Sequence, residues 1–196
     1  MKELPKFEDI KEAIYIIDMN NGFCEKGNLA CPDIKEIVPN IKKLIKNIYN
    51  NNGGIFFVND KHKENSIELK RYPAHCIDNY ESDIIKEFTE EMTMTKGFYE
   101  KNSTCALFAP MMLFDIKFMK KLEKVYIVGC CTDICIVNFA IPLRNFFDET
   151  NRNIKIIVPK NCVSTFESKE HNKEEISKLY FNIMEKNGID CPEEVL

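Results

Sequence analysis

The sequence predicts an α/β fold with a parallel sheet covered by helices on both faces, and three observations support this prediction. Short, apolar, β-branched runs alternate with longer amphipathic stretches along the chain. The strand-like runs are continuously apolar, as in strands that are buried on both faces. No repeat, low-complexity run or linker divides the 196 residues, a length that fits one domain. We therefore expect a single doubly wound domain over residues 1–196.

Five segments have the composition of strands. They are AIYIIDM (13–19), GIFFVN (54–59), KGFYEK (96–101), KVYIVG (124–129) and NIKIIVP (153–159). Helical patterns occupy approximately residues 34–51, 81–91, 114–122, 135–149 and 172–187. Gly53-Gly54 follows the first of these helices and Gly188 follows the last, which predicts left-handed caps at both positions.

Charge and composition exclude several classes of function. The formal net charge of −4 gives no general attraction to nucleic acid or to acidic membranes. The apolar run at 13–17 is too short for a signal peptide core or a membrane span. Nine cysteines without a CxxC pair argue against a disulfide framework or a structural zinc site. We expect a cytoplasmic protein that binds neither nucleic acid nor membrane, and the sequence leaves open whether it forms a homo-oligomer.

The predicted architecture indicates where a functional site should lie. In an open parallel sheet, ligands bind beyond the carboxyl ends of the strands. The segments that follow four of the predicted strands all carry chemically capable side chains. These segments are 18–23, 59–62, 101–104 and 129–135. We expect the site where they meet.

Cys135 lies at the start of the helix predicted after G-C-C-T-D-I-C. The free N–H groups and the dipole of a helix N-terminus favour a thiolate and predict a lowered pKa, and they could also hold an oxyanion. Asp18, after the first strand, could take the thiol proton, and Lys101, ending the third strand, could hold the thiolate or a substrate oxygen. A core cysteine, a loop-capping Asp18 and a solvent-facing Lys101 explain the same pattern, so both interpretations stay open.

A second cluster follows the GIFFVN strand. The segment D-K-H-K-E-N-S-I-E-L-K-R-Y-P-A-H-C contains Asp60, His62 and His75, and so two of the three histidines of the chain. Imidazoles combined with carboxylates suit Zn, Fe or Mn. A polar surface loop is the alternative interpretation of this segment.

Three motifs together resemble the isochorismatase-like cysteine hydrolases, in the same order and at similar separations. They are D-M-N-N-G-F-C (18–24), the lysine of F-Y-E-K-N-S-T (98–104) and G-C-C-T-D-I-C (129–135). The resemblance covers approximately residues 12 to 187. It implies a Rossmann-like, six-stranded parallel sheet.

The resemblance also implies a catalytic triad of Cys135, Asp18 and Lys101. Lys96 is the rival for the lysine role, and the S-T-C-A-L-F run at 103–108 favours Lys101. In the family, a cis peptide precedes the nucleophile, which corresponds here to Cys130-Cys131. It allows the N–H groups of Cys131 and Cys135 to form an oxyanion hole, and Cys130 is assigned to the substrate pocket.

The second cluster resembles the metal site of the nicotinamidases, the metal-carrying branch of this superfamily. Their Asp-x-His pair corresponds to Asp60 and His62, and the histidine of their aromatic-Pro-x pattern corresponds to His75 in Y-P-A-H. Glu68 matches the remaining ligand, with Glu64 as the alternative. The implied cofactor is one divalent ion, zinc first, with iron or manganese as alternatives.

The same branch implies a pocket for a flat heteroaromatic ring. Phe23 and Tyr72 correspond to aromatics that line it, although core packing is the alternative interpretation of each. Gly22 departs from the pattern, because an acidic residue usually precedes the phenylalanine. The sequence thus predicts hydrolysis of nicotinamide to nicotinate and ammonia through a cysteine thioester. The alternative is a metal-independent or differently specific amidohydrolase that acts on another small amide or ureido compound.

Overall fold

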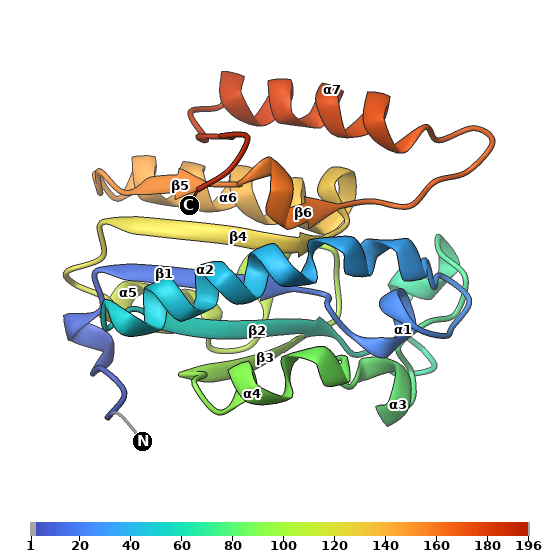
Figure 1. Cartoon of the computed structure of the whole chain (residues 1–196), viewed down its shortest axis with the longest axis horizontal. Helices are drawn as coiled ribbons and strands as arrows, with labels where there is room; N and C mark the ends of the chain where they lie inside the picture. Colours follow the sequence, from blue (N-terminus) through green and yellow to red (C-terminus); the bar gives the residue numbers. More distant parts are fainter. Residues whose placement is uncertain (1–2, 196) are drawn as a thin grey trace.

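The computed structural model describes residues 3–195 and contains a six-stranded sheet in which every pairing between strands is parallel (Figure 1). The strands are β1 (Glu12–Ile17), β2 (Gly54–Asp60), β3 (Gly97–Lys101), β4 (Lys124–Cys130), β5 (Lys155–Ile157) and β6 (Val163–Ser164). Their order is β3-β2-β1-β4-β5, and β6 pairs with the end of β4. Because successive strands run outward from β1 in one direction and then from β4 in the other, the β1–β4 boundary is the switch point of a doubly wound fold. The predicted fold class is confirmed.

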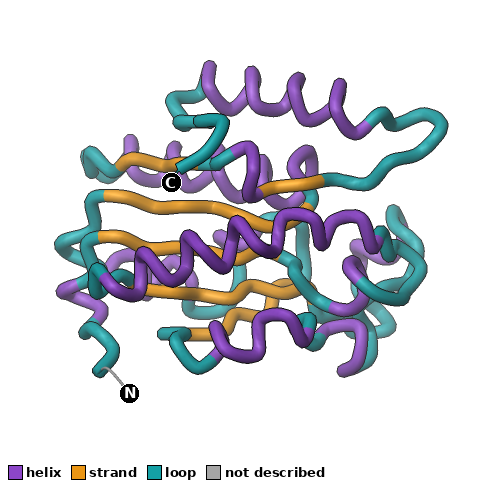
Figure 2. Tube along the Cα trace, viewed as in Figure 1, coloured by secondary structure: helices purple, strands orange, loops and turns teal. Residues whose placement is uncertain are grey.

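Helices cover both faces of this sheet. The α-helices are α1 (Asn21–Cys24), α2 (Val38–Asn50), α3 (Asn79–Ser82), α4 (Thr89–Met92), α5 (Met112–Phe118), α6 (Val137–Glu149) and α7 (Lys173–Lys186). The 3-10 helices are Phe7–Asp9, Pro32–Ile37, Ile67–Lys70, Lys86–Phe88, Ala106–Phe108 and Lys160–Cys162, and Thr132–Ile136 forms a π-helical turn. Figures 1 and 2 show α2 and α4 in front of the sheet, with α5 and α6 behind it. Within residues 3–195, no helix combines the length and the apolar character needed to cross a bilayer.

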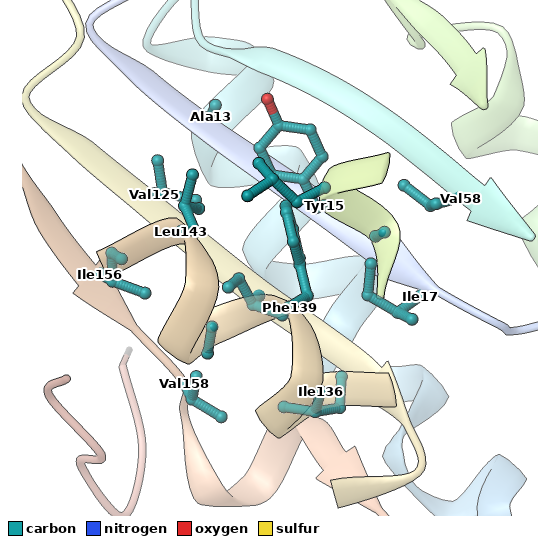
Figure 3. Packing of buried hydrophobic residues seen from close by; sticks show 14 of the residues in the cluster. Ala13, Tyr15, Ile17, Val58, Val125, Ile136, Phe139, Leu143, Ile156 and Val158 are labelled. Carbon is teal, nitrogen blue, oxygen red and sulfur yellow. The ribbon is translucent and has the colours of Figure 1, made fainter. Parts of the chain in front are cut away.

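The sheet separates two apolar cores because neighbouring side chains of a strand point to opposite faces. Tyr15 of β1 faces α6, where its ring meets Phe139 edge-on with centroids 5.3 Å apart. Figure 3 shows Phe139 and Leu143 of α6 packed against side chains of β1 and β4. Ile14 and Ile16 belong to the other core, with the apolar side of α2. Burial on both faces explains why β1 and β2 are almost continuously apolar, whereas the edge strand β3 alternates exposed and buried residues.

The helix predicted over 81–91 is wrong as a single element. The chain forms α3 and α4 there, separated by an extended stretch around Ile84. Ile84 forms an antiparallel bridge with Asn20, and the Ile85 N–H donates to the carbonyl of Met19 at 3.1 Å. These long-range hydrogen bonds replace helical ones. They also fix the loop that follows Asp18.

The two predicted glycine caps have different outcomes. Gly188 adopts the left-handed conformation at φ 77°, as expected after α7. After α2, however, Asn52 is the left-handed residue, at φ 61°. Gly53 is required for another reason, since a Cβ there would lie 2.3 Å from Cγ2 of Ile48 and 2.8 Å from the carbonyl oxygen of Glu12. It permits the close approach of α2 to β1.

Candidate active site

A pocket lies where the carboxyl ends of β1 and β4 meet at the switch point. Its lining comes from all four segments that the sequence singled out and from two further loops. The lining residues are Asp18, Phe23, Leu29, Asp60, Glu68, Tyr72, His75, Thr104, Cys130, Cys131, Ile134 and Cys135. The strand ends therefore converge as a parallel sheet requires.

The ammonium group of Lys101 is at the centre of this site. The side chain is fully buried, and its Nζ lies 2.8 Å from Oδ2 of Asp18, 2.5 Å from Oδ1 of Asp60 and 3.5 Å from Sγ of Cys135. Burial opposes the charge, but Asp18 and Asp60 raise the pKa of Lys101 well above its usual value. Lys96, the rival in the sequence, precedes the opposite end of β3 and places its Nζ 5.1 Å from the ring centroid of Phe7.

Asp18 follows β1 directly and turns the chain with a left-handed φ of 54°. Its Oδ1 accepts a hydrogen bond from the backbone N–H of Asp60 at 2.8 Å. Burial raises the pKa of Asp18 to about 6, although the ammonium of Lys101 opposes this shift. One carboxylate oxygen lies within 4.8 Å of Sγ of Cys135. This carboxyl group can therefore exchange a proton with the thiol near neutral pH.

Cys135 is buried in the π-helical turn that precedes α6. The prediction of a lowered pKa is wrong. Burial raises the pKa of Cys135 well above its usual value, and the effect of Lys101 in the other direction is opposed by Asp18 and Asp60. The fold buries the thiol and brings two carboxylates to the same place, and a position at a helix start reveals neither. A neighbouring base is therefore needed for the sulfur of Cys135 to attack a carbonyl.

The peptide bond between Cys130 and Cys131 is cis, as the family pattern implies. Sγ of Cys130 donates to the carbonyl oxygen of Asp18 at 3.2 Å, which connects the ends of β4 and β1. The carbonyl of Cys131 accepts hydrogen bonds from the N–H groups of Ile134 and Ile136, both at 3.1 Å. These bonds shape the turn that holds Cys135. The oxyanion-hole role of the Cys131 and Cys135 N–H groups stays a prediction.

Four candidate metal ligands lie beside the thiol. Asp60, His62, Glu68 and His75 are all buried, and each offers one ligand atom within 4.8 Å of the other three. Glu68 comes from the 3-10 helix Ile67–Lys70 and is 4% exposed. Glu64, the sequence alternative, is exposed and does not belong to this group. The geometry therefore favours Glu68 over Glu64.

The two histidines are oriented as metal ligands usually are. Nδ1 of His62 lies 2.8 Å from Oδ1 of Asn102, and Nδ1 of His75 lies 2.7 Å from the carbonyl oxygen of Pro73. Because both partners are acceptors, each Nδ1 carries a proton and each Nε2 keeps its lone pair. The two Nε2 atoms lie 3.6 Å and 3.5 Å from Oδ2 of Asp60. Nε2 of His62 is buried without a hydrogen-bond partner, which fits a site for a divalent metal ion.

Aromatic rings enclose the pocket around His75. The ring centroid of Phe23 lies 5.5 Å from that of His75, and the ring of Tyr72 stands edge-on to His75 at 6.4 Å. Both residues line the pocket, where the sequence placed them. Apolar walls with a few polar groups suit a small planar ligand.

Sequence reasoning missed four residues of the site. Asn102 holds His62, and the Thr104 N–H donates to Oε2 of Glu68 at 3.1 Å. Both lie in the 101–104 segment that follows β3, so their position was a usable signal. Leu29 and Ile134 line the pocket as well. Nothing in the sequence separated these two apolar side chains from ordinary core residues.

Comparison with known proteins identifies the family. A family model described as the isochorismatase domain matches residues 12–182. The chain belongs to this family. A relative from Bacillus subtilis (strain 168), named as an uncharacterized isochorismatase family protein PncA, is 24% identical over 173 residues, which is 83% of this chain and 91% of its own.

Two solved structures of similar proteins carry more specific names. Nicotinamidase PncA from Bacillus subtilis superimposes with a TM-score of 0.76 at 22% identity, over 94% of this chain and 100% of that chain. The pyrazinamidase of Pyrococcus horikoshii in complex with zinc gives a TM-score of 0.73 at 19% identity, over 92% and 98% of the two chains. At such identities this likeness establishes a shared fold. The chemistry of the site follows from the residues of this chain.

Proposed function

We propose that this protein is an amidohydrolase that converts nicotinamide to nicotinate and ammonia, with Cys135 as the nucleophile. The observation that carries the proposal is that two sets of side chains lie next to each other at one pocket. A thiol, a carboxylate and an ammonium lie directly beside four candidate metal ligands. A small planar molecule with a carboxamide and a ring nitrogen can reach both groups at once. The names of the similar solved structures support this choice.

In the proposed first half-reaction, Asp18 accepts the thiol proton as the sulfur of Cys135 attacks the amide carbon. A sulfur–carbon bond forms, and the carbonyl electron pair moves to the oxygen. The N–H groups of Cys131 and Cys135 hold this oxyanion. Asp18 then gives its proton to the amide nitrogen, the carbon–nitrogen bond breaks, and ammonia leaves a thioester behind.

The second half-reaction reverses these roles with water. Asp18 removes a proton from the water that attacks the thioester carbon, and the proton returns to the sulfur as the carbon–sulfur bond breaks. The carboxylic acid that forms loses its remaining proton to solvent and leaves as the carboxylate. Throughout, the ammonium of Lys101 stabilises the ionised forms of Asp18 and Cys135, because it touches both.

The metal ligands have a positioning role in this proposal. Asp60, His62, Glu68 and His75 would hold a divalent ion, zinc first, and the bound ion would supply an anchor for the ring nitrogen of the substrate. Phe23 and Tyr72 would flank the ring. The carboxamide would then point at Cys135.

Ammonia release from nicotinamide by the zinc-loaded protein tests this proposal. We expect turnover that falls after treatment with a chelator and returns when metal is added. Benzamide is the matched control substrate, because it keeps the carboxamide and lacks the ring nitrogen, so we expect it to react much more slowly. Metal-loaded protein that releases no ammonia from nicotinamide contradicts the proposal. Hydrolysis of a carbamoyl or ureido compound by the chelator-treated protein supports the alternative amidohydrolase instead.

A further inference from the structure

The third histidine of the chain lies outside the pocket but contacts the turn that carries Cys135. Asp133, two residues before Cys135, accepts hydrogen bonds at both carboxylate oxygens. Oγ1 of Thr165 donates to Oδ1 at 2.6 Å, and Nε2 of His171 donates to Oδ2 at 2.9 Å. Thr165 is buried, and the side chains of His171 and Asp133 are only 16% and 10% exposed. Asp133, Thr165 and His171 are called the clamp below.

His171 has contacts at both ring nitrogens and on the face of its ring. Its Nδ1 lies 2.9 Å from the carbonyl oxygen of Phe166, and its ring stacks on the Phe166 ring with centroids 3.9 Å apart. Since both ring nitrogens face acceptors, only the imidazolium can donate to both. Burial opposes this charge, but Asp133 raises the pKa of His171 above its usual value. The contact with Asp133 is therefore a charge-assisted hydrogen bond.

The segment 165–171 is folded so that these contacts are possible. It connects β6 to α7 and closes on itself through two backbone hydrogen bonds, from the Ser168 N–H to the His171 carbonyl and back. The side chains of Glu167, Ser168, Lys169 and Glu170 are exposed. In contrast, Thr165 and His171, at its two ends, turn toward Asp133. The segment thus fastens the turn Thr132–Ile136 from outside the pocket.

We propose that Asp133, His171 and Thr165 are positioning residues that hold the turn of Cys135 in the geometry needed for attack. The turn is also shaped by its own backbone bonds to Cys131, but those bonds do not attach it to the rest of the protein. The clamp adds an attachment through side chains on a different part of the chain, beside the contact of Lys101 with Cys135. The inference rests on the proposed function in one respect, that Cys135 is the nucleophile. None of the three residues belongs to the pocket lining.

Three near-isosteric variants test the clamp. Thr165→Val removes the hydroxyl, Asp133→Asn removes the charge, and His171→Phe keeps a ring on Phe166 but removes both hydrogen bonds. We expect His171→Phe and Asp133→Asn to lower kcat by on the order of tenfold to a hundredfold, because small displacements of a reacting group have effects of this size. KM and bound metal should stay close to wild type. His171→Gln, which restores an N–H donor, should recover part of the lost kcat.

A second measurement does not depend on turnover of nicotinamide. Iodoacetamide alkylates free thiols, and mass spectrometry reports the rate at Cys135 alone. A loosened turn should expose this buried thiol, so alkylation should become several-fold faster in the clamp variants while kcat falls. Glu170→Gln, an exposed change in the same segment, is the matched control and should alter neither value. A merely structural role would lower the melting temperature without changing either value in the folded protein.

The outcomes separate the two proposals. If kcat and the alkylation rate of Cys135 stay at wild-type values in folded Thr165→Val and His171→Phe, the clamp proposal is wrong even when the wild type hydrolyses nicotinamide. If the wild type releases no ammonia but the variants alkylate faster, the clamp stands and the proposed substrate fails. Loss of kcat with unchanged alkylation also contradicts the clamp, because the turn would then not have moved.

Discussion

Two neighbouring groups of buried side chains meet in this pocket, and they differ in what supplies the positive charge. Asp18, Asp60 and Cys135 surround the ammonium of Lys101, which belongs to the chain itself. Asp60, His62, Glu68 and His75 each offer a ligand atom within 4.8 Å of the other three. The first group, which we call the nucleophile group, carries its own cation. The second, the ligand group, fits an added one.

Asp60 belongs to both groups, and its two oxygens divide between them. Oδ1 contacts Nζ of Lys101, whereas Oδ2 faces Nε2 of His62 and of His75. Burial alone would raise the pKa of Asp60, but Lys101 and the two histidines lower it well below its usual value. The carboxylate therefore stays ionised beside the ammonium of Lys101. Variants in one group should leave the other measurable, provided that Asp60 is kept.

The largest expected effect comes from the nucleophile group. Cys135→Ala should lower the rate of ammonia release by at least about a thousandfold, because the step that forms the thioester is lost. Zinc bound per chain, measured by atomic absorption, should equal that of wild type. Cys31→Ser, a half-buried cysteine outside the pocket, is the matched control and should keep its activity. Retained turnover in Cys135→Ala would overturn the assignment of the nucleophile.

Lys101→Met removes the built-in cation and is expected to rank second. Asp18 and Asp60 then stay buried without their common partner, which should destabilise the fold by about 3–5 kcal/mol. Urea denaturation of the metal-free protein measures this change. Lys96→Met, at the other end of β3, is the control and should cost far less. Equal losses in the two variants would mean that the nucleophile group does not depend on an internal cation.

The ligand group gives the next effect, and the sequence left its third member open. Glu68→Gln should weaken zinc binding by more than about a hundredfold, since a direct ligand matters more than its outer partners. Glu64→Gln, four residues away and exposed, should leave the affinity unchanged. Competition with a chromogenic chelator measures both. The opposite result would exchange the two glutamates and contradict the geometry described above.

The sequence predicted the nucleophile group better than the ligand group, and the reason is physical. Asp18 directly follows β1, which is apolar and buried, so the strand pattern alone directs attention to it. Lys101 ends β3, where exposed and buried residues alternate, and its place at the strand end is the signal. Glu68 and Glu64 lie in the loop after β2, where no periodicity distinguishes a buried carboxylate from an exposed one. Leu29 has the same disadvantage. Only the folded loop decides which of these side chains enters the pocket.

Long-range contacts explain the other differences. β6 has only two residues, too few to show a strand pattern in the sequence. Its pairing with β4 makes it a strand. The extended stretch at Ile84 is created by Asn20, more than sixty positions earlier. The raised pKa of Cys135 has a similar origin, because burial and the carboxylates that follow β1 and end β2 act on the thiol only after folding. Local patterns predicted the elements, and tertiary contacts determined their ends and the charge state of the thiol.

The smallest expected effect comes from Asn102, which contacts His62 of the ligand group. A variant there should distinguish the two groups. Asn102 follows Lys101 but directs its oxygen to Nδ1 of His62 and to the hydroxyl of Ser66, at 2.8 Å and 2.7 Å. Asn102→Ala should therefore weaken zinc binding by about 10–100-fold, the range for partners of a ligating histidine. Asn102→Asp keeps an acceptor and should bind zinc more tightly than Asn102→Ala.

Saturating zinc distinguishes an effect on the ligand group from an effect on the nucleophile group. If Asn102 acts only through His62, kcat of Asn102→Ala should return to nearly the wild-type value once zinc is in excess. Alkylation of Cys135 by iodoacetamide should also proceed at the wild-type rate, because Lys101 keeps its contacts with Asp18 and the thiol. A kcat that stays low at saturating zinc would show instead that the segment after β3 positions both groups. The division at Asp60 would then not be a functional boundary.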